Sequence, residues 1–290
     1  MTSAVYVFGK RSVNVTPLDG EGTMRFAAGL TLLVALGLAA PVGAQPMQTS
    51  ESVRDATLDQ LARRYVEFGG AEDMYVEASV YGFRKGAEAR RVDLSDEQWR
   101  RMDEAVRQAF RPAAEFYVRE VTAFYAQHNA REDLLAAIAF YDTPEGRAYV
   151  AASLAYSLPL TVYLATQGQI PLEQPPSADS IARDRYDLAR ELSEVLVGRI
   201  HPTDIAMIET TTFGMAGLKD YVARSLGSSL ERDELAAALT WANSEPAQRL
   251  EGVSAERTLM MQSVLLRATQ QVDMPALTTR VQEIMRETPA

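Results

Sequence analysis

Apolar residues recur at intervals of three and four from Thr57 to the end of the chain. No stretch shows the strict alternation of apolar and polar residues that is typical of a half-buried strand. The first such stripe contains Leu58, Leu61, Tyr65 and Phe68. The pattern therefore predicts an all-α protein that folds as a helical bundle.

Glycine, proline and capping residues set the expected helix boundaries. The first helix is expected to end at Gly69-Gly70 and the second, which includes Met74, at Gly86. The sequence from Ser95 to Gln98 is a capping box ahead of a long helix, within which Pro112 predicts a kink or a break. A helix capped by Asn129 is expected at 134–141, and the next helix is expected to begin at Thr143-Pro144. Further helices are expected at 181–197, within 202–226 and at 233–242. The last two expected helices are a long one from Ser244 and a short one after Pro275.

The segment 167–180 divides the chain into two parts of similar pattern, because it contains Pro171, Pro175 and Pro176 and few bulky residues. It is interpreted as a linker between helical halves at 57–166 and 181–290. Residues 133–140 align with residues 234–241 at a constant offset of 101, and a capped turn with a proline follows each segment. This predicts an internal repeat; the alternative is convergence of two amphipathic helices that each end in an aromatic residue.

The most apolar run of the chain, FAAGLTLLVALGLAA at 26–40, lies close to the N-terminus. It follows Arg25 and precedes a small-x-small site formed by Val42 and Ala44, which is the pattern of a secretory signal peptide. We expect 1–44 to be the signal region, with Met24 as the true start and cleavage after Ala44, and 45–56 to be a flexible mature N-terminus. The run is shorter than the ~20 residues of a spanning helix. The prediction is a periplasmic or secreted protein that does not span the membrane after cleavage; an uncleaved N-terminal anchor is the alternative.

Composition narrows the classes of function. The chain has 39 acidic and 29 basic residues and a net charge of −10, which argues against a nucleic-acid partner. It has no cysteine, which excludes disulfides, thiol catalysis and thiolate metal sites, and only two histidines, His128 and His201. No metal and no cofactor is expected.

A search for catalytic groups assigns no catalytic residue. His128 ends a helix, where an imidazolium is favoured by the helix dipole, and is interpreted as structural. His201 lies three residues before Asp204, but no serine elbow, glycine-rich loop or metal-spaced histidine accompanies the pair. Four pairs of adjacent carboxylates stand at expected helix starts, where negative charge stabilises the helix. The short basic clusters are interpreted as solvated helix faces. Among them, Arg84-Lys85 and Arg90-Arg91 are the best candidates for contact with an anionic partner.

The segment EDLLAAIAFYDTPEGRAYV at 132–150 carries a recognisable motif. It resembles the signature of the domain-of-unknown-function family two-zero-five-nine, in which a Phe-Tyr pair is followed by Ser/Thr-Pro-x-Gly at the start of the next helix. The resemblance covers roughly 110–165, and its matching positions are Asp133, Leu134, Phe140, Tyr141, Thr143, Pro144 and Gly146. It implies an exported helical protein of Gram-negative type without an established activity. The corresponding part of the second half departs from the motif, because Trp241-Ala242 replaces the aromatic pair and Ala247 replaces the glycine.

Two interpretations of this motif remain open. As structure, it predicts a rigid helix-turn-helix corner: Thr143 caps the second helix, Pro144 is its first residue, and Gly146 lets the neighbouring helix approach closely. As a site, it makes Phe140, Tyr141, Thr143, Pro144 and Gly146 the candidate binding residues for a ligand or partner.

The sequence favours a non-enzymatic module that binds an envelope protein or component through a groove between the halves. The alternative is a hydrolase of unfamiliar class that uses His201 or carboxylates in a cleft between the halves. A third hypothesis is an envelope protein that acts only through self-assembly. The sequence leaves the partner and the oligomeric state open.

Overall fold

The computed structural model describes residues 55–89, 92–165, 171–200, 205, 208–209, 211, 213–252 and 255–286, together with two short strands near the N-terminus. The strands, β1 (Tyr6–Phe8) and β2 (Arg11–Val13), pair antiparallel. All other regular elements in the described ranges are helical, which confirms the predicted all-α class. The apolar run of the expected signal peptide at 26–40, the cleavage position after Ala44 and most of 45–56 lie outside the described residues.

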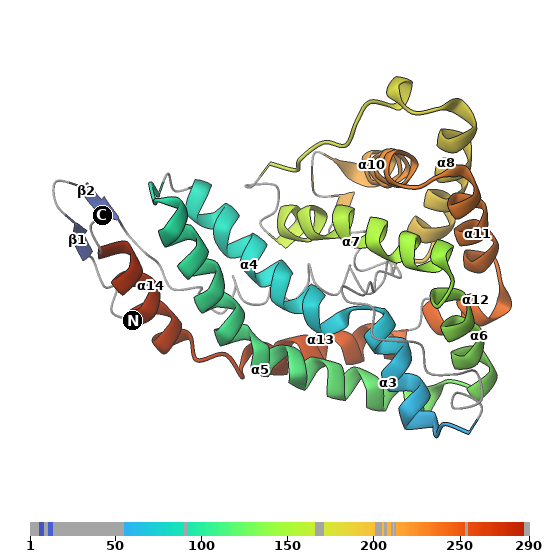
Figure 1. Cartoon of the computed structure of the whole chain (residues 1–290), viewed down its shortest axis with the longest axis horizontal. Coiled ribbons are helices and arrows are strands. Elements are labelled where there is room, and N and C mark those ends of the chain that lie inside the picture. Colours follow the sequence, from blue (N-terminus) through green and yellow to red (C-terminus); the bar gives the residue numbers. More distant parts are fainter. Residues whose placement is uncertain are drawn as a thin grey trace.

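Figure 1 shows the helices in the order in which they follow one another along the chain. Those of the first half are α3 (Leu58–Phe68), α4 (Ala71–Ala89), α5 (Asp96–His128), α6 (Arg131–Tyr141) and α7 (Pro144–Ala165). After the short 3-10 helix η1 (Ala178–Ser180) come α8 (Arg183–Val197), α10 (Gly214–Ser229), α11 (Arg232–Ala242), α12 (Glu245–Glu251), α13 (Ala255–Thr269) and α14 (Met274–Arg286).

Local sequence signals account for several of these boundaries. The predicted capping box is confirmed: the Ser95 hydroxyl accepts from the Gln98 amide, and the Gln98 side chain accepts from the Ser95 amide at 3.0 Å. Between α3 and α4, Gly70 has a φ of 54°, in the left-handed region that disfavours residues with a side chain. The predicted stop at Gly69-Gly70 is therefore confirmed.

The stop expected at Gly86 is wrong, because helix α4 continues through it to Ala89. Of the two outcomes predicted at Pro112, a kink or a break, the break is wrong, because α5 continues through it as one helix from Asp96 to His128. Helix α4 packs along α5 and α7, and α5 is also covered by α3, α13 and α14. Burial of these faces outweighs the ~1 kcal/mol that an internal glycine costs and the ~3 kcal/mol of an internal proline.

Two other boundary predictions are also wrong. Asn129 belongs to the end of α5, where its side-chain amide donates to the Tyr125 carbonyl oxygen at 3.1 Å, and α6 begins after Ala130 without a side-chain cap. The expected long helix from Ser244 is divided into α12 and α13. Gly252 follows α12 in an extended conformation, and a Cβ there would lie 2.1 Å from the Gln248 carbonyl oxygen. The chain thus leaves α12 at a position where only glycine fits.

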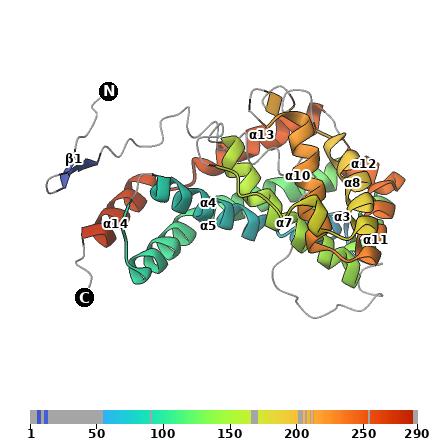
Figure 2. The ribbon, with the colours of Figure 1, turned by 90° about the horizontal axis from the view of Figure 1, so that it is seen from above.

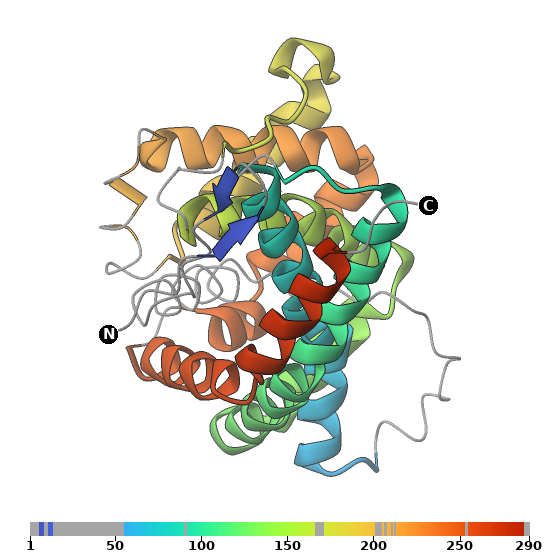
Figure 3. The same ribbon diagram turned by 90° about the vertical axis from the view of Figure 1, so that its left-hand side faces the viewer.

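The helices form an elongated molecule with two regions (Figures 1 and 2). At one end, α14 packs along the N-terminal part of α5, on which α4 also packs. We call this region the arm. Figure 3, which looks at the molecule from the arm, shows α14 in front of the longer helices. The Gln98 side chain joins two arm helices by donating to the Ile284 carbonyl oxygen at 3.0 Å. At the other end, α6, α7, α8, α10, α11 and α12 form the wider part of the bundle.

One continuous hydrophobic core runs through both halves, from Leu61 in α3 to Ile284 in α14. Helix α3 packs on α5 and α6, while α8 packs on α10 and α11. The halves meet where α6 packs on α12, α7 packs on α10 and α11, and α13 packs on α5. Among the described residues no helix has both the length and the apolar character that crossing a membrane requires.

The described part of the segment between the halves lies against α10. Residues 171–177 are neither helix nor strand. The Arg224 guanidinium donates to the Pro175 carbonyl oxygen and to the Gln174 side-chain oxygen, at 3.1 Å each. Leu172 is buried in the same region. This stretch is therefore fixed to the second half by specific contacts.

Candidate functional site

The predicted helix-turn-helix corner is confirmed at α6 and α7. The Thr143 hydroxyl donates to the Phe140 carbonyl oxygen at 2.8 Å and accepts from the Gly146 amide at 2.9 Å. One side chain thus ties the end of α6 to the first turn of α7, which begins at Pro144. The sequence assigned these local roles correctly.

Gly146 allows the close approach that the sequence predicted. A Cβ at this position would lie 2.1 Å from the Phe140 carbonyl oxygen and 2.8 Å from the Tyr141 Cα atom. Both neighbours are backbone atoms of the corner, so neither can move aside as a flexible side chain would. The glycine is therefore a steric requirement of this corner.

We expect Gly146→Ala to lower the free energy of unfolding by about 1–3 kcal/mol, because the corner must open to admit the methyl group. The reverse change at the corresponding position of the second half, Ala247→Gly, is the matched control and should cost no more than about 1 kcal/mol. Urea unfolding followed by circular dichroism measures both. Equal stability of Gly146→Ala and the unmodified protein would show that the corner is looser than described.

The aromatic pair of the motif points into the protein. Tyr141 is 4% exposed, and half-buried Phe140 stacks on Trp241 of α11 with ring centroids 5.1 Å apart and an interplanar angle of 11°. Tyr141 also makes an edge-on contact with Trp241 at 5.8 Å. Phe140 and Trp241 are the two aromatic residues that the offset of 101 aligns. The motif therefore lies where the halves meet, and this position is packed with side chains where the sequence analysis expected a groove.

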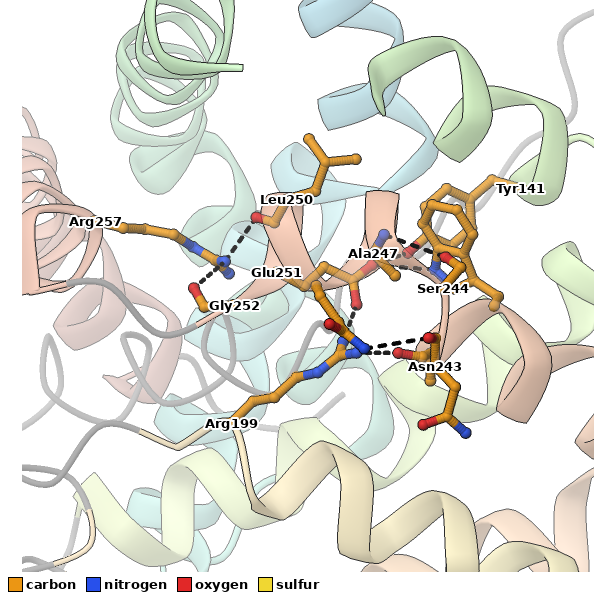
Figure 4. Close-up of polar contacts among 12 residues, drawn as sticks. Tyr141, Arg199, Asn243, Ser244, Ala247, Leu250, Glu251, Gly252 and Arg257 are labelled. Atoms are coloured by element: carbon orange, nitrogen blue, oxygen red, sulfur yellow. Dashed lines mark hydrogen bonds and ion pairs between the residues drawn. The ribbon is translucent and has the colours of Figure 1, made fainter. Parts of the chain in front are cut away.

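A buried carboxylate lies at the centre of this contact (Figure 4). Glu251, the last residue of α12, is 2% exposed. Its Oε1 accepts from the Tyr141 hydroxyl at 2.8 Å and from the Trp241 Nε1 at 3.2 Å, and its Oε2 accepts from the Arg199 guanidinium at 2.8 Å. Arg199 also donates to the Ala242 carbonyl oxygen, so the charged pair is surrounded by hydrogen bonds. We call Phe140, Tyr141, Trp241, Glu251 and Arg199 the junction.

A second arginine and several tyrosines surround the junction. Arg257, at the start of α13, is buried and donates to the carbonyl oxygens of Leu250 at 2.7 Å and Gly252 at 3.3 Å. Burial raises the pKa of Tyr141 well above its ordinary value, and the negative charge of Glu251 raises it further. Burial likewise raises the pKa of Tyr65, whose ring packs edge-on against Tyr125. These hydroxyls stay protonated at neutral pH, so they act as hydrogen-bond donors and not as bases.

Another buried carboxylate also joins the halves. Asp133 lies in the first turn of α6, as predicted, but its main contact is a bidentate ion pair with Arg249 of α12, at 2.7 and 2.9 Å. The Asp133 side chain is 4% exposed and that of Arg249 is 56% exposed. Sequence reasoning assigned Asp133 to helix stabilisation alone and missed this pair, because 116 residues separate its partners.

The other candidate groups are also engaged in the structure or lie outside its described part. His128 ends α5; its ring stacks on Phe124, and its Nε2 lies 3.3 Å from a Glu256 carboxylate oxygen. Lys85 is paired with Glu88 at 3.0 Å, and Arg84 lies 3.6 Å from Asp103. His201, Asp204, Arg90 and Arg91 are outside the described residues, within which no group of three or more metal-binding side chains occurs.

Comparison with known proteins adds no relative. No family model matches the chain, and neither a curated protein nor a solved structure is significantly similar to it. The resemblance of 132–150 to family two-zero-five-nine therefore stays a prediction from the motif residues.

Proposed function

We propose that the protein is an exported, periplasmic helical protein that acts as a non-enzymatic interaction module for an envelope protein or component. The proposal takes its location from the signal-peptide pattern at 25–44. It places the partner-binding surface on one of the helices that the structure describes. Because the motif residues pack within the bundle, we propose that partner binding uses another part of the molecule.

The outer face of α13 is the observation that carries this proposal. Leu259 and Leu266 are 66% and 41% exposed, two turns apart on the same side of the helix. Ser263 lies between them on this side, and the opposite side buries Met261, Val264, Leu265 and Ala268 in the core. Exposed large apolar side chains that share a helix face, here flanked by the charged Glu256 and Arg267, are typical of amphipathic surfaces that receive a partner helix or groove. We therefore assign partner binding to this face, defined by Leu259, Ser263 and Leu266.

Site-specific photo-crosslinking in cells tests the proposal. A photoreactive residue in place of Leu259 should capture a discrete envelope partner, which mass spectrometry identifies. The matched control is the same residue in place of Asp233, whose side chain is 92% exposed on α11. The assignment would be contradicted if no adduct formed at Leu259, or if the same adducts formed at both positions.

We also propose that the chain contains the internal repeat expected from its sequence. Helices α6 and α11 have the same length and start at Arg131 and Arg232, the offset of 101 found in the alignment. The same offset relates the ends of α5 and α10, at His128 and Ser229, and the starts of α7 and α12. The repeat then comprises the C-terminal part of α5 with α6 and α7, and α10 with α11, α12 and α13.

The hydrolase alternative gains no support from the described residues. Both buried carboxylates, Asp133 and Glu251, are held in ion pairs with arginines, and Glu251 also accepts from Tyr141 and Trp241. The remaining candidate, His201, is outside the described part of the chain.

A further inference from the structure

The outer face of α13 begins at a negative charge. Glu256 lies three residues before Leu259, and its side chain is 72% exposed. One of its carboxylate oxygens lies 3.3 Å from the Nε2 of His128, which places Glu256 on the side of α13 that faces α5. The carboxylate therefore meets solvent at the N-terminal end of the face.

The C-terminal end of the same edge carries more positive than negative charge. The guanidinium groups of Arg267 in α13 and Arg119 in α5 lie 5.5 and 5.0 Å from the centre of one ring, that of Phe116. Both groups also lie near one carboxylate, that of Glu120, at 3.2 and 3.5 Å. The Arg267 and Arg119 side chains are 50% and 68% exposed. Two guanidinium groups thus share one carboxylate, which leaves positive charge available to an anionic group from outside.

The middle of the face is narrow and apolar. Ser263 is exposed between the exposed side chains of Leu259 and Leu266. A row of this width fits the side chains of one helix, and the small Ser263 permits an axis separation of about 8–10 Å. An extended peptide would turn unpaired backbone N–H and C=O groups toward the leucines, whereas a helix pairs these groups internally. The shape and chemistry of the face therefore favour a helix as the element that covers it.

We propose that the partner protein covers this face with one amphipathic helix, oriented antiparallel to α13. The inference rests on the proposed interaction module and specifies the structure of its partner. Acidic residues are favoured in the first turn of a helix and basic residues in the last turn. In the antiparallel orientation the acidic first turn meets Arg119 and Arg267, and the basic last turn meets Glu256. A parallel orientation would place like charges together at both ends.

Photo-crosslinking at two positions of the full-length protein in cells tests the type of element and its direction. The photoreactive residue replaces Leu259 in one variant and Gln270, which is exposed one turn after Leu266, in the other. These positions are about 16 Å apart along α13, which corresponds to about 11 residues of a partner helix but only about 5 residues of an extended strand. Tandem mass spectrometry of the adducts identifies the partner residue reached from each position.

We expect both positions to capture the same partner within one segment, at partner residues separated by about 8–14 positions. The residue reached from Gln270 should precede the residue reached from Leu259 in the partner sequence. The opposite order, a separation typical of a strand, or contacts in two distant segments would overturn the proposal.

Removal of the positive charge tests the basis of the orientation. Arg119→Gln/Arg267→Gln should lower the yield of the Leu259 adduct at least fivefold. The matched control is Arg183→Gln/Arg190→Gln on α8, because these exposed arginines also share one carboxylate, that of Asp187. The control should leave the yield unchanged, and circular dichroism should show the same helical signal for both double variants. Equal yields in the two double variants would contradict the role assigned to Arg119 and Arg267.

The outcomes separate this inference from the proposed function on which it rests. If neither position of α13 captures a partner, the interaction module itself is contradicted, and the docked helix with it. If a discrete partner is captured with the wrong separation or order, the interaction module stands and only the antiparallel helix is overturned.

Discussion

Glu251→Ala is expected to lower the free energy of unfolding by about 3–5 kcal/mol. The substitution leaves the Arg199 charge, whose side chain is only 11% exposed, without its carboxylate. It also removes the acceptor of the Tyr141 hydroxyl and the Trp241 indole. Burying a charge without a partner costs more than losing an exposed ion pair, so this effect should be among the largest of any single substitution in the second half. Urea unfolding followed by circular dichroism measures it.

The matched control for this prediction is Glu245→Ala in the same helix. Glu245 pairs with Arg249 at 3.1 Å, but its side chain is 84% exposed. An exposed pair contributes about 1 kcal/mol or less. If the two substitutions destabilised the protein equally, Glu251 would not have the central position described for it.

Tyr141→Ala is expected to lower the free energy of unfolding by about 3–5 kcal/mol, because it removes a buried ring from between Tyr65 and Trp241. Tyr141→Phe keeps the ring and removes only the hydroxyl bond to Glu251. Since a hydrogen bond to a charged group contributes about 1.5–3 kcal/mol, this variant should lose less stability.

The result for Tyr141 also decides between the two interpretations of the motif. A residue that contacts an external partner can be truncated with little loss of stability, and only partner capture suffers. If Tyr141→Ala were as stable as the unmodified protein but captured less partner, the motif would be a binding site and not a junction. The matched measurement is photo-crosslinking at Leu259 in the Tyr141→Phe background, which should capture the partner normally.

The sequence predicted the parts of the fold that short-range chemistry determines. Thr143, Pro144 and Gly146 form the expected corner because their contacts are with residues three to six positions away. The Ser95 capping box is equally local. The helix stop expected at Gly86 and the break that was one of two outcomes expected at Pro112 do not occur, because neighbouring helices cover α4 and α5, and no local pattern reports that packing.

The junction could not be predicted from the sequence, although three of its residues, Phe140, Tyr141 and Trp241, were noted. The bond from Tyr141 to Glu251 spans 110 residues, and the pair of Arg199 with Glu251 spans 52. Glu251 stands in the sequence as one carboxylate among 39, without a spacing that distinguishes it. The only signal was the repeat itself, since an aromatic residue at the same place in two similar helices is consistent with a shared contact. That signal aligned Phe140 with Trp241 but did not say that their rings would touch.

We infer that the junction joins the halves into one folding unit. The two tryptophans of the chain provide a direct test, because Trp99 lies in α5 of the first half and Trp241 in α11 of the second. Incorporation of 5-fluorotryptophan gives each of them its own fluorine NMR signal, so Trp99 is followed separately while Trp241 keeps its place in the junction. Leu192→Ala then removes a fully buried side chain from α8, in the second half, at an expected cost of about 2–5 kcal/mol.

The measurement is urea unfolding of the unmodified sequence and of Leu192→Ala, followed by the Trp99 fluorine signal and by circular dichroism on the same samples. We expect one transition by both methods, and Leu192→Ala should shift the Trp99 midpoint as far as it shifts the helical signal. A Trp99 transition that stays in place while part of the helical signal unfolds at lower urea would show that the halves unfold separately, which contradicts the claim.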